Sequence, residues 1–221
     1  MTSALPSPLA NESSTCFLCT AANGDRMIDD AVDRGQRSWY DDIVVQTSRA
    51  FSILGVGALT EGYFLVSPTT HAESVAQLDD ENWLDFSRCL QATIDLCLDR
   101  FGPPVFFEHG GSSQRGSISS CVDHAHLHVF PLANRIQLQI GGPSQQFETF
   151  EHFGRHRQSF STTPYLLCSN DGASCAVAED TGERQFFRRQ IAQAVNLADE
   201  WDYAAFPRYE TMRNTLDRLV G

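Results

Sequence analysis

The sequence predicts an α+β protein in which an antiparallel meander sheet packs against one long helix. Apolar residues recur at helical spacing from Trp83 to Cys97, behind an N-cap at Asp79 or Asp80, and Gly102-Pro103-Pro104 ends the helix. Glycine-containing turns separate the first three short apolar runs, as expected for a meander. The runs that predict strands are residues 43–47, 51–54, 63–66, 105–107 and 121–131.

The second half of the chain has a different pattern and predicts a mainly α extension. A small hairpin is expected at 165–167 and 175–177, and two helices are expected around 187–195 and 209–219. We divide the chain into a disordered tail at 1–13, a core domain at 14–135 and an extension packed on that domain at 136–221.

The charge pattern excludes several classes of function. The formal net charge is −12, and all 16 basic residues are arginine, so lysine Schiff-base chemistry is excluded. The acidic balance argues against broad nucleic-acid binding but leaves room for an arginine-lined anion pocket. Without a leader or a long apolar run, the sequence predicts a soluble cytoplasmic protein with no membrane partner.

Three of the seven histidines, His124, His126 and His128, occur at alternate positions. Side chains alternate between the faces of a strand, so all three imidazoles are expected on one face, opposite Ala125 and Leu127. Three imidazoles on one face suit a metal site or phosphate chemistry better than a core.

This His-x-His-x-His run, with two apolar residues and Pro131 after it, resembles the signature of the histidine triad superfamily. The order of elements and the Cys-x-x-Cys near the N-terminus strengthen the resemblance, which covers roughly residues 14–135. It implies a histidine-triad-like fold and cleavage of a nucleotide at its α-phosphorus. His126 would be the nucleophile and would form a nucleotidyl-histidine intermediate. His128 would donate a hydrogen bond to the phosphate or the leaving group.

The resemblance implies a nucleotide hydrolase acting on a nucleoside or dinucleoside polyphosphate or on a nucleoside phosphoramidate. A histidine at position 128, where transferases of the superfamily carry Gln, favours hydrolysis over transfer. Two alternatives stay open: a nucleotidyltransferase or phosphorylase, and a nucleotide- or RNA-binding module without turnover. A homodimer is common among small members, and the extension is a candidate for replacing it.

A structural zinc site is the second implication. Two cysteines separated by two residues are a usual half-site for zinc. The resemblance implies four zinc ligands, Cys16, Cys19, His71 and His124, so that the first histidine of the triad would also bind the metal. Unpaired thiols are the alternative, and His109 is a rival for the fourth ligand.

Several other residues are assigned to substrate binding by the same resemblance. Ser119 and Ser120 would supply hydrogen-bond donors, and His109 stands where the family usually has Asn close to the site. The neighbouring Glu108 would repel phosphate unless it is protonated or turned away. The apolar candidates for the nucleobase pocket are Phe17, Leu18 and Leu54. In the extension, Arg188 or Arg189 could reach a polyphosphate tail, although a solvated helix face explains both equally well.

Overall fold

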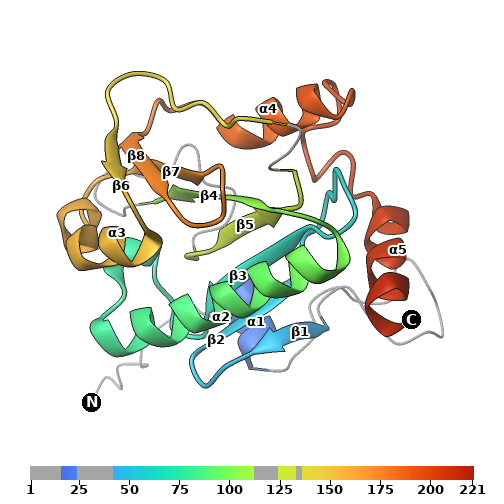
Figure 1. The fold of residues 1–221 in the computed structure, drawn as a ribbon, viewed down its shortest axis with the longest axis horizontal. Coiled ribbons are helices and arrows are strands. Elements are labelled where there is room, and N and C mark those ends of the chain that lie inside the picture. Colours follow the sequence, from blue (N-terminus) through green and yellow to red (C-terminus); the bar gives the residue numbers. More distant parts are fainter. Residues whose placement is uncertain (1–15, 24–41, 112–123, 133–135) are drawn as a thin grey trace, which may run out of the picture.

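A computed structural model describes residues 16–23, 42–111, 124–132 and 136–221 of this protein (Figure 1). One antiparallel sheet of eight strands, in the order β1-β2-β3-β5-β4-β7-β8-β6, carries helices around it, which confirms the α+β prediction. The predicted tail at 1–13 lies outside the described residues. Within the described part of the chain, no helix has the length and apolar character needed to cross a membrane.

The strands are β1 (Ile43–Gln46), β2 (Ala50–Leu54), β3 (Phe64–Pro68), β4 (Val105–Gly110), β5 (Leu127–Phe130), β6 (Gln145–Phe147), β7 (Tyr165–Ser169) and β8 (Cys175–Glu179). The helices are α1 (Phe17–Ala22), α2 (Asp80–Arg100), α3 (Phe150–His156), α4 (Phe186–Ala194) and α5 (Tyr209–Val220). The described residues also form short 3₁₀ turns at η2 (Val75–Gln77) and η4 (Arg157–Phe160).

The long helix α2 forms where the sequence predicts it. The Asp79 carboxylate caps it by accepting a hydrogen bond of 2.8 Å from the backbone N–H of Asn82, and acidic residues follow in the first turn, where the helix dipole favours them. The residues at helical spacing, among them Phe86 and Leu90, are buried against the sheet. The helix stops at Arg100, and Gly102 then adopts a φ of 117° that a side chain would disfavour.

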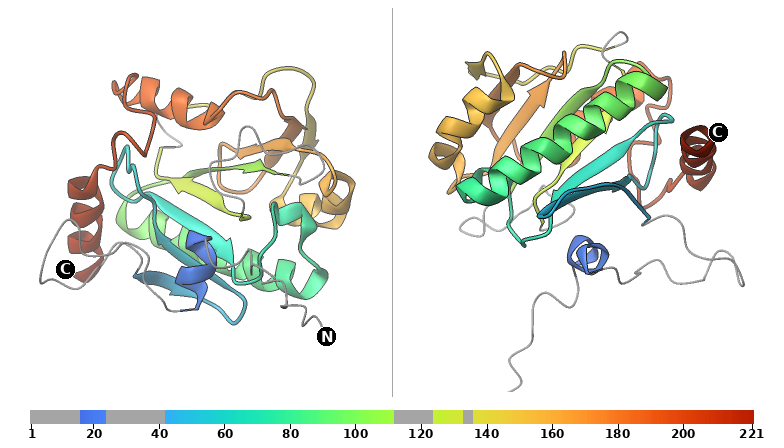
Figure 2. Two further views of the ribbon diagram at one scale, coloured as in Figure 1. Left: turned by 180° about the vertical axis from the view of Figure 1, so that it is seen from behind. Right: turned by 60° about the horizontal axis from the view of Figure 1, so that its bottom comes forward.

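Strand register divides the central side chains between two faces, because directly paired residues of antiparallel strands share a face. One face carries Ile53, Leu65, His128 and Phe107. The other carries Leu54, Phe64, Val129 and Phe106. Helices α1 and α2 lie on opposite faces of the sheet (Figure 2). The face of Leu54 packs beneath α2, and that of Ile53 meets α1.

The C-terminal part of the chain extends the same sheet. The predicted hairpin is present as β7 and β8, and β7 pairs with β4 from Phe106–Ser169 to Gly110–Tyr165. Strand β6 pairs with β8 at the far edge. Sequence patterning did not reveal that the hairpin continues the central sheet.

The C-terminal helices also contact the rest of the molecule. On α4, the Phe187 ring lies 5.0 Å from that of Phe107, on the face that carries His128. On α5, the hydroxyl of Thr215 accepts a hydrogen bond from the backbone N–H of Gly62, before β3. Helix α5 stands at one end of the sheet in Figure 1.

Candidate functional site

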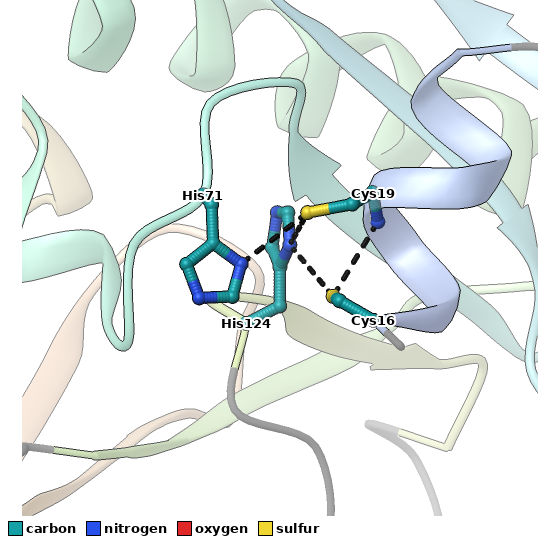
Figure 3. A group of neighbouring side chains, drawn as sticks. All are labelled: Cys16, Cys19, His71 and His124. Carbon is teal, nitrogen blue, oxygen red and sulfur yellow. Dashed lines mark hydrogen bonds between the residues drawn. The ribbon is translucent and has the colours of Figure 1, made fainter. Parts of the chain in front are cut away.

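The histidine segment does not form one continuous strand. Strand β5 begins only at Leu127, so the expectation that all three histidines alternate along a strand is wrong for His124 and His126. The backbone N–H of Ala125 bonds instead to the carbonyl of Ala72, in the loop after β3. The His124 ring lies beside the N-terminal cysteines (Figure 3).

His126 is fixed by a hydrogen bond to the backbone. Its Nδ1 lies 2.7 Å from the carbonyl oxygen of His124. A carbonyl can only accept, so Nδ1 must carry the hydrogen and Nε2 keeps its lone pair. Burial, followed by the positive charge that His109 can carry, lowers the pKa of His126 and favours the neutral ring. The partly buried Nε2 is therefore chemically suited to act as a nucleophile.

His128 lies beside His126, with 4.7 Å between the ring centroids. Its Nδ1 is 2.7 Å from the hydroxyl of Tyr63, and its ring stacks on Phe107 at 4.4 Å. The Tyr63 ring occupies the space beside Gly55, where an added Cβ would lie only 2.0 Å from a ring atom. Burial, then the neighbouring charges of His126 and Arg188, holds the pKa of His128 well below its usual range.

The four predicted metal ligands come together on the other side of His124. One ligand atom from each of Cys16, Cys19, His71 and His124 lies within 4.8 Å of all the others (Figure 3). The Nδ1 of His124 is 3.3 Å and 3.4 Å from the two sulfurs, and that of His71 is 3.3 Å from Cys19. Cys16 caps helix α1 and Cys19 lies within it, whereas His71 follows β3 and His124 precedes β5.

The chemistry of this cluster fits a metal ion. The Nε2 of His124 lies 3.0 Å from the carbonyl of Pro68, so the hydrogen is on Nε2 and the lone pair of Nδ1 faces the cysteines. Burial, followed by the adjacent Cys16, raises the pKa of Cys19 to about 11, so a cation is the partner that would stabilise a thiolate there. Two thiols and two imidazoles are a tetrahedral donor set typical of a structural site.

Glu108 and His109 lie on opposite faces of β4. The Glu108 carboxylate is buried, accepts a hydrogen bond of 2.8 Å from the N–H of Val75 and also contacts the hydroxyl of Tyr165. It is therefore turned away from the histidines. The Nε2 of His109 lies 2.8 Å from Oδ1 of Asp180, and His109 is absent from the metal cluster, so its role as a rival ligand is wrong.

The predicted nucleobase pocket is only partly compatible with the structure. Leu54 lies on the face of the sheet opposite His128, so its assignment is wrong, and Ile53 is the residue of β2 that shares the face of His128. Leu18 is fully buried beside Ile53, and Phe17 packs partly buried next to it. Their role in binding a base stays a prediction, and Ser119 and Ser120 fall outside the described residues.

Two arginines of α4, which the sequence could not tell apart, differ sharply in the structure. Arg188 is 2% exposed and donates to the carbonyl oxygens of Gly57 at 2.8 Å and Trp201 at 3.0 Å. In the described part of the chain it forms no ion pair, and its Nη1 has no hydrogen-bond partner. Arg189 instead stacks on the Trp201 ring at 3.6 Å and approaches Glu183 at the surface. Arg188 is thus a buried positive charge near His128.

Sequence reasoning did not identify Tyr63 or Asp180, which contact His128 and His109. In the sequence, Tyr63 is an ordinary aromatic residue of a predicted strand. The glycine at position 55, which leaves space for the Tyr63 ring, is the one indication of its position. Asp180 is distant in sequence from the histidines, and only the strand order brings it near them.

No protein-family model matches this sequence, and no curated protein matches it significantly. The solved structures that resemble it include a hypothetical protein from Leishmania major, with 20% identity and a TM-score of 0.45 over 67% of this chain and 95% of that one. A Zn-bound histidine triad family protein from Mycobacterium smegmatis has 20% identity and a TM-score of 0.39, covering 54% and 76%. A histidine triad nucleotide-binding protein from Candida albicans has 17% identity and a TM-score of 0.40, covering 66% and 94%. The functional argument below therefore depends on the side chains of this chain.

Proposed function

We propose that this protein is a nucleotide hydrolase of the histidine triad type. It would cleave a nucleoside or dinucleoside polyphosphate, or a nucleoside phosphoramidate, at the α-phosphorus. The observation that carries the proposal is the hydrogen bond from Nδ1 of His126 to the carbonyl of His124, because it leaves Nε2 as a free nucleophile. His109, His128 and the buried Arg188 lie near His126, and this group of side chains suits an anionic substrate.

In the proposed reaction, Nε2 of His126 attacks the α-phosphorus and the bond to the leaving group breaks. Water then attacks the nucleotidyl-histidine, which releases the nucleotide and restores the neutral ring. The low pKa of His128 keeps that ring neutral, and its Nδ1 is held by Tyr63, so the hydrogen-bonding capacity of Nε2 is directed to the substrate. The buried charge of Arg188 adds a positive potential that favours phosphate oxygens.

Zinc is the metal that we propose for Cys16, Cys19, His71 and His124, where it would have a structural role. His124 connects the two parts of the site: its ring would bind the metal, while its backbone carbonyl accepts the hydrogen bond from His126. Fixing the His124 ring would therefore also fix the acceptor that orients the nucleophile.

The test is a covalent trap with nucleotides labelled at the α-phosphate, followed by mass spectrometry of the labelled peptide. We expect the adduct on His126, and His126→Asn should lower turnover by about 10³-fold or more, as removal of a nucleophile does in other enzymes. His156→Asn, at an exposed histidine of helix α3, is the matched control and should have wild-type activity.

Unchanged turnover in His126→Asn would rule out the proposal. Faster formation of a nucleotidylated product than of free nucleotide, when phosphate or a sugar phosphate is added, would identify a transferase instead. Tight nucleotide binding without turnover would identify a binding module.

A further inference from the structure

A fourth histidine lies on the same face of the sheet as His128. The register of β4 and β5 pairs Phe107 with His128, and His109 is two residues further along β4, so its side chain shares that face. The His126 ring, just before β5, lies 4.7 Å from that of His128. The electrostatic influence of His109 on both of the other rings agrees with this position. We therefore expect a phosphate bound at His126 to lie near the rings of His109 and His128.

Among the residues that the structure describes, His109 is the histidine with a carboxylate partner. Its Nε2 lies 2.8 Å from Oδ1 of Asp180, and both side chains are about 90% buried, at 11% and 9% exposure. The contact does not have the geometry of a hydrogen bond from Nε2, and it becomes an ion pair when the His109 ring is protonated. A buried carboxylate at this distance stabilises an imidazolium by Coulomb attraction.

Strand order explains how Asp180 reaches this position. His109 on β4 pairs with Leu166 on β7, and Leu166 pairs with Ala178 on β8. Asp180 is two residues beyond Ala178 and so lies on the same face, and its own N–H is bonded to the carbonyl of Pro164. The C-terminal segment therefore places one specific carboxylate beside the fourth histidine.

We propose that His109 is the general acid of the proposed reaction and that Asp180 is its positioning residue. As Nε2 of His126 forms its bond to phosphorus, the bond from phosphorus to the leaving group breaks, and the leaving group takes a proton from Nδ1 of the His109 imidazolium. In the second half-reaction water attacks phosphorus, the bond from phosphorus to Nε2 of His126 breaks, and the proton of the water passes to His109, which restores the starting state. This inference rests on the proposed function and assigns a role that His128 does not fill, because a neutral imidazole is a weak acid.

The test compares leaving groups that do and do not need a proton. Nucleoside 5′-phosphoramidates carrying an alkylamine need protonation, whereas p-nitrophenyl esters of the same nucleotides release a stable anion; all four nucleobases are used. We expect Asp180→Asn to lower kcat/KM for the phosphoramidate by about 30-fold or more, and His109→Asn by about 10²–10⁴-fold. Both variants should keep kcat/KM within about 3-fold of wild type on the nitrophenyl ester, because kcat/KM reports only the first half-reaction, in which nitrophenolate leaves without an acid.

Controls separate this role from a structural one. Asp180→Glu keeps the carboxylate and should recover part of the lost rate, while Glu179→Gln, on the exposed neighbour, should behave as wild type. Activity on the nitrophenyl ester shows that each variant is folded, and thermal melting is measured alongside. If one of Asp180→Asn and His109→Asn does not fold, the comparison of the two substrates is made with the other variant.

Equal losses on both substrates in a folded variant, or no loss on either, would overturn the role of the pair while leaving the proposed function intact. If wild-type protein cleaves neither substrate, the proposed function is wrong and the inference falls with it.

Discussion

At the scale of single residues, Glu108 couples folding to pH. Burial raises the pKa of this carboxyl from 4.5 to about 8, against which the hydrogen bonds from Tyr165 and Val75 act only in part. Between these two pH values the folded protein binds more protons than the unfolded chain. The contribution of Glu108 to stability is therefore complete below about pH 4.5 and is lost as pH rises through about 8.

We expect Glu108→Gln to remove this dependence, because an amide of the same shape stays neutral. Relative to wild type, the variant should gain stability between pH 5 and pH 8 by at least ~1.4 kcal/mol, the equivalent of one pKa unit. Urea unfolding at several pH values measures the difference. Glu179→Gln, exposed on β8, is the control, and a parallel pH profile for wild type and Glu108→Gln would contradict the expectation.

The same residue scale shows where sequence reasoning ends. The histidines and the two cysteines could be identified because their side chains are chemically unusual at that spacing. The orientation of Glu108 and His109 could not, since a slip of one residue exchanges the two faces of a strand. The misassignment of Leu54 in place of Ile53 has the same cause.

At the scale of elements, helix α1 depends on the proposed metal site. Its six residues are too few for a stable isolated helix. It is held by the burial of Leu18 and Ala21 against β2 and by Cys16 and Cys19 at its start. Loss of the metal should therefore unfold α1 while the sheet stays folded.

We expect protein that is purified without any chelator to contain about one zinc ion per chain. Chelation, or Cys19→Ser, should raise hydrogen exchange and proteolysis at α1 and lower nucleotide turnover, because His124 also positions His126. Cys175→Ser, at a buried cysteine outside the cluster, is the matched control. Metal content far below one per chain, or unchanged exchange at α1 after chelation, would rule out the site.

The long helix α2 could be predicted, whereas the short helix α3 could not. Helix α2 has a cap, a helical repeat and a glycine stop, and all three are local. Helix α3 forms within a polar stretch because the rings of Phe150 and Trp83 pack 4.8 Å apart and Gly154 allows the Trp83 ring to approach. Such tertiary contacts leave no periodic pattern in the sequence.

At the scale of the whole molecule, the C-terminal segment is structurally continuous with the residues before it. Strand β4 lies between β5 and β7, and its residues from Phe106 to Gly110 pair with β7, beyond residue 136. The Asp180 carboxylate and Arg188 reach the candidate site from the same segment. The predicted division at residue 135 therefore falls inside one sheet.

We expect a fragment ending at residue 135 to fail to fold cooperatively, because removing β7 leaves β4 as an apolar edge strand. The contacts that Phe106 makes with Phe150, and Phe107 with Phe187, would be lost together with the covering strand. A chain ending at residue 207 is the matched control: it lacks only α5, where Met212 and Thr215 are the buried residues, and should fold with a lower melting temperature.

Calorimetry and analytical gel filtration distinguish the two fragments. A soluble 14–135 fragment that unfolds in one transition near the melting temperature of the full chain would instead support an independent core domain, and Asp180 and Arg188 would then be additions to a complete fold.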